Sequence, residues 1–278
     1  MRKYLQWAIL VAATVSMAAL CWGAGSQFRF AAYGDCRDGH EVHRKIVRQM
    51  LTGKPAFVIA TGDFVDRGDN EAAWQIFADI VSPIKSAIPY YPIIGNHDLE
   101  HGGKGYYKKN LGFSSNTGQM RYYSLNYGNS HFIVLDSTNL DEQQLQWLQA
   151  DLKSSEKKFK HRFAAFHYPL WTLVPRRVEA TEKVRQQLQA TLTAAKLCGV
   201  FLGHDHYFYM TKQEGVTYMT TGGGGAALYD MDESLAHPGD KYCKCNHFIR
   251  VTVSSKRATA EVRDPAGKVL DQFVICSH

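Results

Sequence analysis

The feature that most constrains this sequence is the segment Ala60–Gly68, which reads A-T-G-D-F-V-D-R-G. It follows a short apolar run, Ala56–Ile59, whose composition predicts a buried strand that ends in an acidic loop. Four other strand-like runs end in polar loops of the same kind. These loops are Gly34-Asp35, Gly95-Asn96-His97-Asp98, His167 and Gly203-His204-Asp205-His206. Because functional loops gather at the ends of parallel strands, the pattern predicts one site assembled from several strands.

The side chains in these loops are of the types that bind metal ions. One Asn, two Asp and three or four His residues stand at the strand ends. Imidazole nitrogens and carboxylate or amide oxygens suit Fe, Mn and Zn, and such donors can form a hydrolytic site with two metal ions. A lone histidine is more often structural, but the joint pattern favours metal ligands. His247, in C-N-H-F, fits a structural and a supporting role equally well.

The first third of the chain alternates strand and helix patterns. Strands are expected at Phe28–Gly34, Phe57–Thr61 and Tyr90–Ile94, and helices at Glu41–Leu51 and Glu71–Val81. This β-α-β-α-β order predicts a parallel sheet with its functional loops at the strand ends. The Gly-rich stretch Asn96–Gln119 then predicts a long functional loop.

The rest of the chain predicts a second α/β passage followed by antiparallel strands. A hairpin across Gly128-Asn129 comes first, and an antiparallel region begins at Tyr207. The other expected elements are helices at Asp141–Leu152 and Arg176–Ala194, and strands at Arg162–Phe166, Gly199–Leu202, Tyr207–Lys212, Val216–Thr221, Asn246–Val253, Ala258–Arg263 and Val269–Ile275. No repeat or linker interrupts the pattern, so residues 26–278 are expected to form one domain with two sheets.

Residues 1–25 have the features of a secretory signal peptide. Arg2 and Lys3 precede an uncharged, mostly apolar stretch, and small residues follow it. That stretch is nearly the ~20 residues of a membrane helix, so an uncleaved N-terminal anchor is the alternative. Both interpretations predict an exported chain, periplasmic or secreted, which would contact a membrane only through this segment and only if the segment is not cleaved. The net charge of +6 permits a phosphorylated small-molecule substrate and does not indicate nucleic-acid binding.

Six cysteines fit an exported protein. Cys21 lies in the leader, so the five others leave at least one unpaired within a monomer. We expect a disulfide between Cys276 and either Cys243 or Cys245, because all three lie in the C-terminal β region. Cys198 leads into an apolar strand and is interpreted as a small buried hydrophobe.

Taken in order, the motifs G-D, G-D-x-x-D-R-G, G-N-H-D, H and G-H-x-H resemble those of the calcineurin-like metallophosphoesterases. The likeness covers nearly all of the chain after the leader, and Tyr122–Pro169 also resembles the purple-acid-phosphatase-like branch. The resemblance implies an α/β fold, a four-layer α/β/β/α sandwich of two mixed sheets. It also implies hydrolysis of phosphoesters by metal-bound hydroxide. An acid-phosphatase-like phosphomonoesterase is favoured over a phosphodiesterase, and a non-catalytic metal- or phosphate-binding module is the third possibility.

The resemblance also implies a role for each residue of the motifs. Asp63 would bridge two metal ions, as a carboxylate with two oxygens can. The other ligands would be Asp35 and His206 on the first metal, and Asn96, His167 and His204 on the second. His97 would act as general acid or stabilise transition-state charge, Asp66 would orient it, and Arg67 would bind phosphate.

One position departs from the family pattern. The first motif of the family is usually Asp-x-His, and Arg37 stands where that His binds the first metal. Purple acid phosphatases supply a Tyr three residues after the bridging Asp, and here that residue is Asp66. Arg37 therefore replaces a ligand with a permanent cation. It can bind substrate phosphate instead, with one of the two metal ions weakly bound or absent. Asp38 and His40 are weaker candidates for a replacement ligand.

Overall fold

The computed structural model describes residues 27–111 and 120–278. The predicted leader, residues 1–25, lies outside them. None of the described helices is long and apolar enough to span a bilayer.

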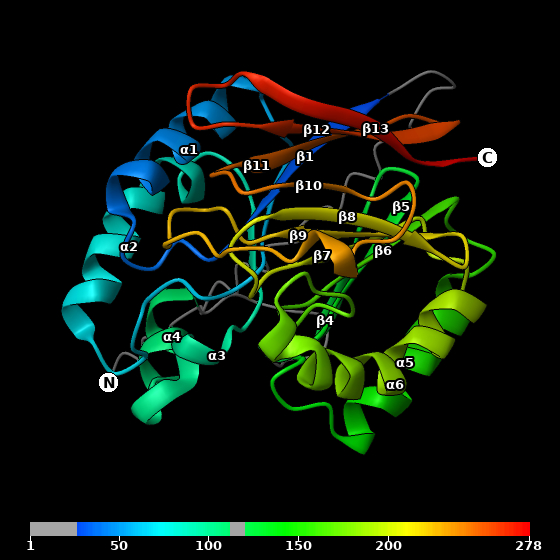
Figure 1. The fold of residues 1–278 in the computed structure, drawn as a ribbon, viewed down its shortest axis with the longest axis horizontal. Coiled ribbons are helices and arrows are strands. Elements are labelled where there is room, and N and C mark those ends of the chain that lie inside the picture. Colours follow the sequence, from blue (N-terminus) through cyan, green and yellow to red (C-terminus); the bar gives the residue numbers. More distant parts are fainter. Residues whose placement is uncertain (1–26, 112–119) are drawn as a thin grey trace, which may run out of the picture.

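The chain forms two mixed β-sheets that lie face to face, with helices on both outer sides (Figure 1). The first sheet contains β1 (Phe28–Tyr33), β2 (Val58–Ala60), β3 (Tyr90–Pro92), β11 (Phe248–Val253), β12 (Arg257–Arg263) and β13 (Val269–Ser277). Its order is β13-β12-β11-β1-β2-β3, with β1, β2 and β3 parallel. The expected β-α-β-α-β start is therefore present.

The second sheet has the order β10-β8-β9-β7-β6-β5-β4. Its strands are β4 (Tyr123–Tyr127), β5 (Ser130–Val134), β6 (His161–Ala165), β7 (Gly199–Leu202), β8 (Phe208–Gln213), β9 (Val216–Thr221) and β10 (Lys241–Cys243). The hairpin across Gly128-Asn129 joins β4 to β5. The region after Tyr207 is only partly antiparallel, because β9 pairs antiparallel with β8 but parallel with β7. The short strand β10 was not predicted from the sequence.

The helices complete the outer layers. They are α1 (His40–Thr52), α2 (Glu71–Lys85), α3 (Asn96–Leu99), α4 (Lys104–Leu111), α5 (Glu142–Ser155) and α6 (Val178–Ala194), with short 3-10 turns at Glu100–Gly102, Pro175–Arg177 and Glu233–Leu235. Helices α3 and α4 lie in the stretch where a loop was expected, so that prediction is wrong for its first half. Tyr107 of α4 is buried against Trp74 of α2, with ring centroids 6.1 Å apart. This tertiary contact stabilises the helix more than the nearby glycines destabilise it.

Three separate cores hold the layers together. Aromatic side chains fill the space between the sheets, where Phe30 packs edge-on against Phe132 and Phe201. A second core joins the first sheet to α1 and α2 around Trp74, and a third joins the second sheet to α5 and α6 around Leu188. Burial of these apolar surfaces drives folding, and it confirms the predicted four-layer α/β/β/α sandwich.

The cysteine pairing differs from the prediction. The disulfides join Cys198 to Cys276 and Cys243 to Cys245, and Cys36 is a buried free thiol. The predicted pairing of Cys276 with Cys243 or Cys245 is wrong, as is the interpretation of Cys198 as a plain hydrophobe. The physical reason is that β13 of the first sheet passes the start of β7 in the second. The Cα atoms of Cys198 and Cys276 are 5.2 Å apart there.

Candidate metal centre

The polar loops that the sequence singles out meet at one edge of the two sheets. Three of their residues have a left-handed backbone, with φ of 57° at Asp35, 54° at Asp63 and 71° at His204. L-residues with side chains rarely adopt this conformation, and such strain is concentrated at functional sites. At each of these residues the backbone turns sharply where the strand ends. All three side chains thereby enter the same small volume.

Two groups of donors form there, and both include Asp63. In each group the donor atoms lie within 4.8 Å of one another. The first group is Asp35, Asp63 and His206, and the second is Asp63, His167 and His204. Asn96 adjoins the second group, because its Oδ1 is 3.2 Å from Nε2 of His167. The structure thus brings together all six residues that the sequence nominated as ligands.

Backbone carbonyls orient two of these imidazoles. Nδ1 of His167 donates to the carbonyl of Thr61 at 2.7 Å, and Nδ1 of His206 donates to the carbonyl of Ala227 at 2.8 Å. A carbonyl can only accept, so Nε2 carries the lone pair in each neutral ring. These Nε2 atoms face Asp63 at 3.4 Å and Asp35 at 3.5 Å, respectively. Histidines that bind metals are held in this way.

The charges of the site are strongly coupled. Burial lowers the pKa of His167, but the Asp63 carboxylate outweighs it and raises that pKa to about 9. Burial raises the pKa of Asp63, but the charge of His167 outweighs it and lowers that pKa below its usual range. For His204, burial and then repulsion from His167 lower the pKa to about 2. A cation here would replace the proton on His167, since a ligating imidazole is neutral.

Asp98 fixes the loop that carries Asp63. Its carboxylate accepts backbone N–H groups from Asp63 at 3.0 Å, Phe64 at 2.8 Å and Gly95 at 2.9 Å. A Cβ on Gly95 would lie 2.3 Å from Oδ1 of Asp63, so only glycine allows the two loops to approach so closely. Burial and then the charge of Asp63 raise the pKa of Asp98 to about 8. Asp98 thus holds together two of the loops that supply ligands.

His97 lies at the rim of the donor groups and contacts Arg37. Nη1 of Arg37 is 2.8 Å from Nε2 of His97, and a guanidinium can only donate. Nδ1 of His97 donates to the backbone carbonyl of Asp66 at 2.7 Å, and the Glu100 carboxylate is 3.3 Å from the same nitrogen. The sequence suggested that Asp66 orients His97. The contact comes from the Asp66 carbonyl, and the acidic side chain beside the ring belongs to Glu100.

Arg67 does not join this cluster. Its guanidinium forms two hydrogen bonds with Asp69, at 3.0 and 3.2 Å, and its side chain is 54% exposed. Asp38 and His40 are also absent from the donor groups formed by the described residues. His247 is buried beside Gly223, with Nδ1 donating to the carbonyl of Cys245 at 3.0 Å.

A hydrogen-bond network that the sequence did not reveal supports the H-x-H loop. It is centred on Asp205, the residue between the two histidines. Buried Asp205 accepts hydrogen bonds from Thr172 and Arg177 at 2.5 Å and from Tyr207 at 2.6 Å. Arg177 also lies over the ring of Tyr229, which stacks on His206 with centroids 4.1 Å apart. Tyr229 places its hydroxyl 3.4 Å from Nε2 of His206. Only the acidic residue inside H-D-H could have signalled this network, because Tyr229 and Arg177 lie in no motif.

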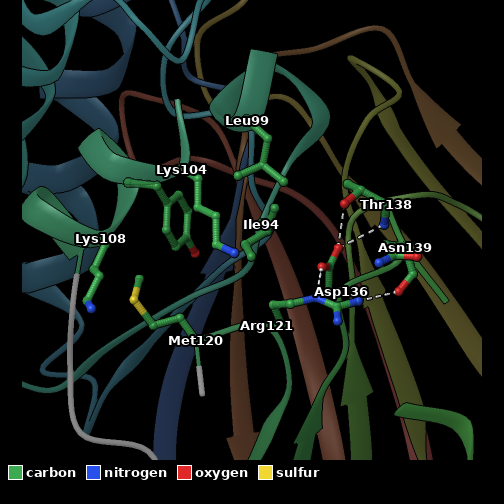
Figure 2. Close-up of a pocket in the computed structure, with 10 residues that line it drawn as sticks. Ile94, Leu99, Lys104, Lys108, Met120, Arg121, Asp136, Thr138 and Asn139 are labelled. Carbon is green, nitrogen blue, oxygen red and sulfur yellow. Dashed lines mark hydrogen bonds and ion pairs between the residues drawn. The ribbon is translucent and has the colours of Figure 1, made fainter. Parts of the chain in front are cut away.

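Two cavities adjoin this edge of the molecule. One of about 250 Å³ is lined by His204 together with Tyr168 and Arg177, so it opens directly onto the second donor group. The other, of about 470 Å³, contains none of the six candidate ligands (Figure 2). Its carboxylate, Asp136, is already paired with Arg121 at 2.8 Å. The smaller cavity is therefore the one that can place a substrate at the donors.

Comparison with known proteins places this arrangement in a family. The family model for calcineurin-like phosphoesterases matches residues 28–208. The chain belongs to that family. Members of it use divalent metal ions, and the clustered nitrogen and oxygen donors fit such ions.

Curated relatives agree with this assignment. The chain is 26% identical to purple acid phosphatase 23 of Arabidopsis thaliana over 192 residues, 62% of this chain and 42% of the relative. It is 28% identical to purple acid phosphatase 21 of the same plant over 237 residues, 74% and 54% of the two chains. It thus spans about half the length of these relatives.

Two solved structures share the fold over most of this chain. A purple acid phosphatase from yellow lupin (Lupinus luteus) superposes with a TM-score of 0.76 at 20% identity, covering 91% of this chain and 54% of that one. GAP50, described as the anchor in the inner membrane complex of Plasmodium, superposes with a TM-score of 0.73 at 15% identity, covering 91% and 89%. At these identities the likeness concerns the fold alone.

Proposed function

We propose that this chain is a metal-dependent phosphomonoesterase, similar to the acid phosphatases, that holds two divalent or trivalent metal ions bridged by Asp63. The observation that carries the proposal is the pair of donor groups that share this one buried carboxylate. A carboxylate has two oxygens and can contact both ions. Fe, Mn and Zn all suit the mixed nitrogen and oxygen donors.

The two ions would have different protein ligands. Asp35 and His206 would join Asp63 on the first ion, and Asn96, His167 and His204 would join it on the second. When bound, such ions lower the pKa of a water nucleophile and neutralise charge on the phosphoryl oxygens. Tyr229, with its hydroxyl 3.4 Å from Nε2 of His206, would be a further oxygen ligand for the first ion. It would offset the ligand that Arg37 replaces.

The remaining residues would act on the substrate. His97 would donate a proton from Nε2 to the leaving oxygen, or stabilise its charge, once Arg37 has moved from Nε2 to the substrate, while the carbonyl of Asp66 and the carboxylate of Glu100 hold Nδ1. Arg37 would bind a phosphoryl oxygen, because its guanidinium already lies beside His97 and its Nε is buried without a hydrogen-bond partner in the described part of the chain. Arg67 would serve the same purpose only after leaving Asp69.

The substrate class is proposed from the relatives and from the cavity at His204. The relatives are named purple acid phosphatases, which favours monoesters. The cavity of about 250 Å³ suits a phosphorylated small molecule, and we expect no specific nucleic-acid binding. A phosphodiesterase of the same family is the alternative activity.

Turnover of p-nitrophenyl phosphate and bis-p-nitrophenyl phosphate tests this proposal. We expect the monoester to be hydrolysed faster, and a chelator to abolish turnover until a metal salt is added back. Faster turnover of the diester would make the chain a phosphodiesterase. Activity that survives the chelator would refute the metal-dependent mechanism. No activity with any added metal would indicate a non-catalytic binding module, which the fold also permits.

Metal content tests the dinuclear arrangement separately. We expect two metal ions per chain in the wild type and no further ion in Arg37→His. One ion in the wild type that rises to two in Arg37→His would mean that Arg37 stands in for a metal. Asp63→Asn should lose both ions, whereas Asp79→Asn, an exposed aspartate on α2, should keep them.

We also propose that the chain is exported as one domain over residues 26–278, released or held by its N-terminal segment. Two disulfides in the described residues support an oxidising compartment. Mass spectrometry of the chain isolated from the periplasm or culture medium of its native cells would give the mature N-terminus. An intact leader on a cytosolic chain would contradict export.

A further inference from the structure

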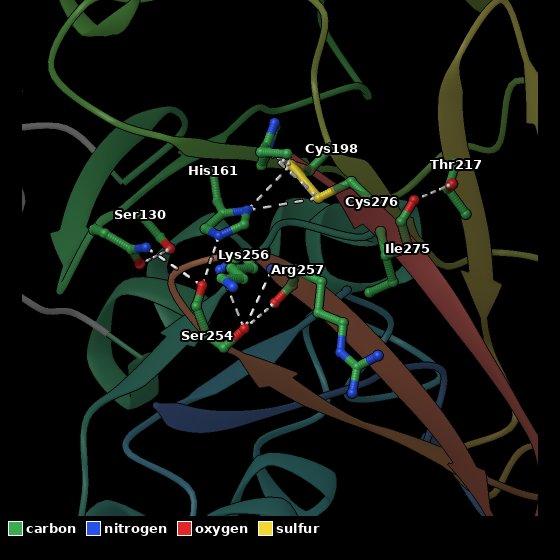
Figure 3. Close-up of a disulfide and its surroundings, with 11 residues drawn as sticks. Ser130, His161, Cys198, Thr217, Ser254, Lys256, Arg257, Ile275 and Cys276 are labelled. Atoms are coloured by element: carbon green, nitrogen blue, oxygen red, sulfur yellow. Dashed lines mark hydrogen bonds between the residues drawn. A yellow bond between two sulfur atoms is a disulfide. The ribbon is translucent and has the colours of Figure 1, made fainter. Parts of the chain in front are cut away.

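A second cluster of metal-binding side chains lies at the opposite edge of the second sheet. His161 begins β6 and Cys198 immediately precedes β7, and these two strands are parallel. The same strands lead at their other ends to His167 and His204 of the candidate metal centre. At about 3.3 Å per residue, the two clusters are roughly 15–20 Å apart. Cys276 of β13 and His278 complete the second cluster, and Figure 3 shows His161 facing both sulfurs.

The sulfur–nitrogen separations among the four side chains match those of a tetrahedral site, and the two sulfurs, bonded to each other in the disulfide, would move apart on reduction. Sγ of Cys198 is 3.6 Å from Nδ1 of His161 and 3.3 Å from Nε2 of His278. Sγ of Cys276 is 3.6 and 3.8 Å from the same two nitrogens. With usual Zn–S and Zn–N bond lengths, the sulfur–nitrogen edge of a tetrahedron is about 3.6 Å.

His161 is oriented as a metal ligand would be. Its Nε2 is 2.8 Å from the carbonyl of Ser254, which can only accept, so Nε2 carries the hydrogen. The lone pair of Nδ1 then faces the two sulfurs, and the ring is fully buried. Metal-bound histidines commonly donate their other nitrogen to a backbone carbonyl. Burial also lowers the pKa of His161 and of His278, which favours the neutral, ligating form.

We propose that His161, Cys198, Cys276 and His278 bind one Zn²⁺ ion whenever the disulfide between Cys198 and Cys276 is reduced. A phosphine or thiol reductant supplies two electrons and is itself oxidised, and the disulfide becomes two thiols by taking up two protons. Each thiol releases its proton when its sulfur binds Zn²⁺. The soft thiolates favour Zn²⁺ over the harder ions. In either form the cluster ties β13 of the first sheet to the start of β7 in the second.

Cobalt replacement tests this site in the full chain. Co²⁺ bound by thiolate shows sulfur-to-cobalt charge-transfer absorption, whereas the candidate metal centre offers only nitrogen and oxygen donors. A phosphine reductant is used because dithiols bind metals. We expect the reduced wild type to bind one more Co²⁺ per chain than the oxidised wild type, to gain this absorption with that ion, and to lose the absorption when Zn²⁺ is added. Cys198→Ser leaves only the Cys276 thiolate and should gain at most about half of this absorption, whereas the double variant Cys243→Ser/Cys245→Ser should behave as the wild type.

An exposed ligand gives a variant that keeps the fold. His278→Ala should weaken Co²⁺ binding, measured by the same absorption, at least about tenfold. His237→Ala removes another exposed histidine and should change nothing. The proposal is overturned if the reduced wild type shows no charge transfer, if Cys198→Ser retains it in full, or if His278→Ala binds Co²⁺ as well as the wild type.

Protection from alkylation gives an independent measurement. In the reduced chain, Zn²⁺ should slow the reaction of Cys198 and Cys276 with iodoacetamide at least about tenfold, because a bound thiolate is a poorer nucleophile than a free one. Cys243 and Cys245 should react at an unchanged rate. Equal protection of all four residues, or of none, would refute the site.

Discussion

Among single residues, Arg37 is the one beside this centre that departs from the family pattern. Its backbone follows the Asp35 turn, and its guanidinium donates to Nε2 of His97 at 2.8 Å. An arginine is permanently charged, so the site keeps one fixed positive charge whatever metals it holds. That charge lies beside the residue proposed to protonate the leaving group.

We expect Arg37→Met to lower kcat/KM about 10–100-fold, mainly through KM. A hydrogen bond to a charged group contributes about 1.5–3 kcal/mol, and Arg37 would lose its bond to the phosphoryl group. Steady-state kinetics with p-nitrophenyl phosphate measure the effect, with metal content checked in parallel. Arg44→Met is the matched control, because it removes an exposed arginine paired with Asp79. A gain of one metal ion by Arg37→Met would show that Arg37 displaces a cation and does not bind substrate.

The sequence identified the six candidate ligands because each follows a strand, and strand ends converge at one sheet edge. It did not identify Tyr229, Arg177 or Glu100, since their approach to the site depends on how loops fold back over the strands. Arg67 shows the same limit. Its motif suggested phosphate binding, but its side chain is bonded to Asp69. Side-chain direction on an exposed loop is not encoded in motif spacing.

At the level of secondary structure elements, α1 is attached to the first sheet through a buried histidine. His43 packs between Tyr33 and Phe77, with ring centroids 5.4 and 5.8 Å away. Its Nε2 is 3.0 Å from the hydroxyl of Tyr33, which also contacts Tyr90 at 2.9 Å. Burial, reinforced by His40 and Arg44, lowers the pKa of His43 to about 3.

This buried histidine makes stability depend on pH. Because its folded pKa lies below the unfolded value of 6.5, the unfolded chain takes up the proton first as pH falls. The contribution of His43 to the free energy of unfolding should therefore be highest above pH 6.5 and fall towards pH 3, by about 2 kcal/mol at pH 5. Urea unfolding of His43→Phe should show a pH dependence shallower by one proton. His237→Gln should match the wild type, and an unchanged slope in His43→Phe would contradict this account.

Element order was the most predictable property of the fold, since apolar runs of strand length alternate with helix-period patterns. The exceptions have physical causes. Helix α4 follows glycines and buries only Tyr107 and Leu111, so its packing on α2 and not its sequence pattern makes it a helix. The parallel pairing of β7 with β9 joins strands that have β8 between them in the chain, and local periodicity carries no information on such pairing.

For the whole molecule, the arrangement of the two sheets depends on what joins them at the edge far from the candidate metal centre. The aromatic core between the sheets is non-directional, whereas the Cys198–Cys276 disulfide is a fixed link. Beside it, the hydroxyl of Thr217 in β9 donates to the carbonyl of Ile275 in β13 at 2.8 Å (Figure 3). Cys198 and Cys276, which the disulfide joins, are 78 residues apart in sequence.

A link across so long a loop should stabilise the fold strongly. The disulfide closes a loop of 78 residues and so lowers the conformational entropy of the unfolded chain. In the chain-entropy treatment this raises the free energy of the unfolded state by about 4 kcal/mol. We expect Cys198→Ala/Cys276→Ala, unfolded in urea with a chelator present, to lose free energy of unfolding of that order. Cys243→Ala/Cys245→Ala removes a link between residues two apart, so in the same treatment it should lose only about 1.5 kcal/mol. Equal losses in the two double variants would mean that packing between the sheets, and not the covalent link, fixes their arrangement.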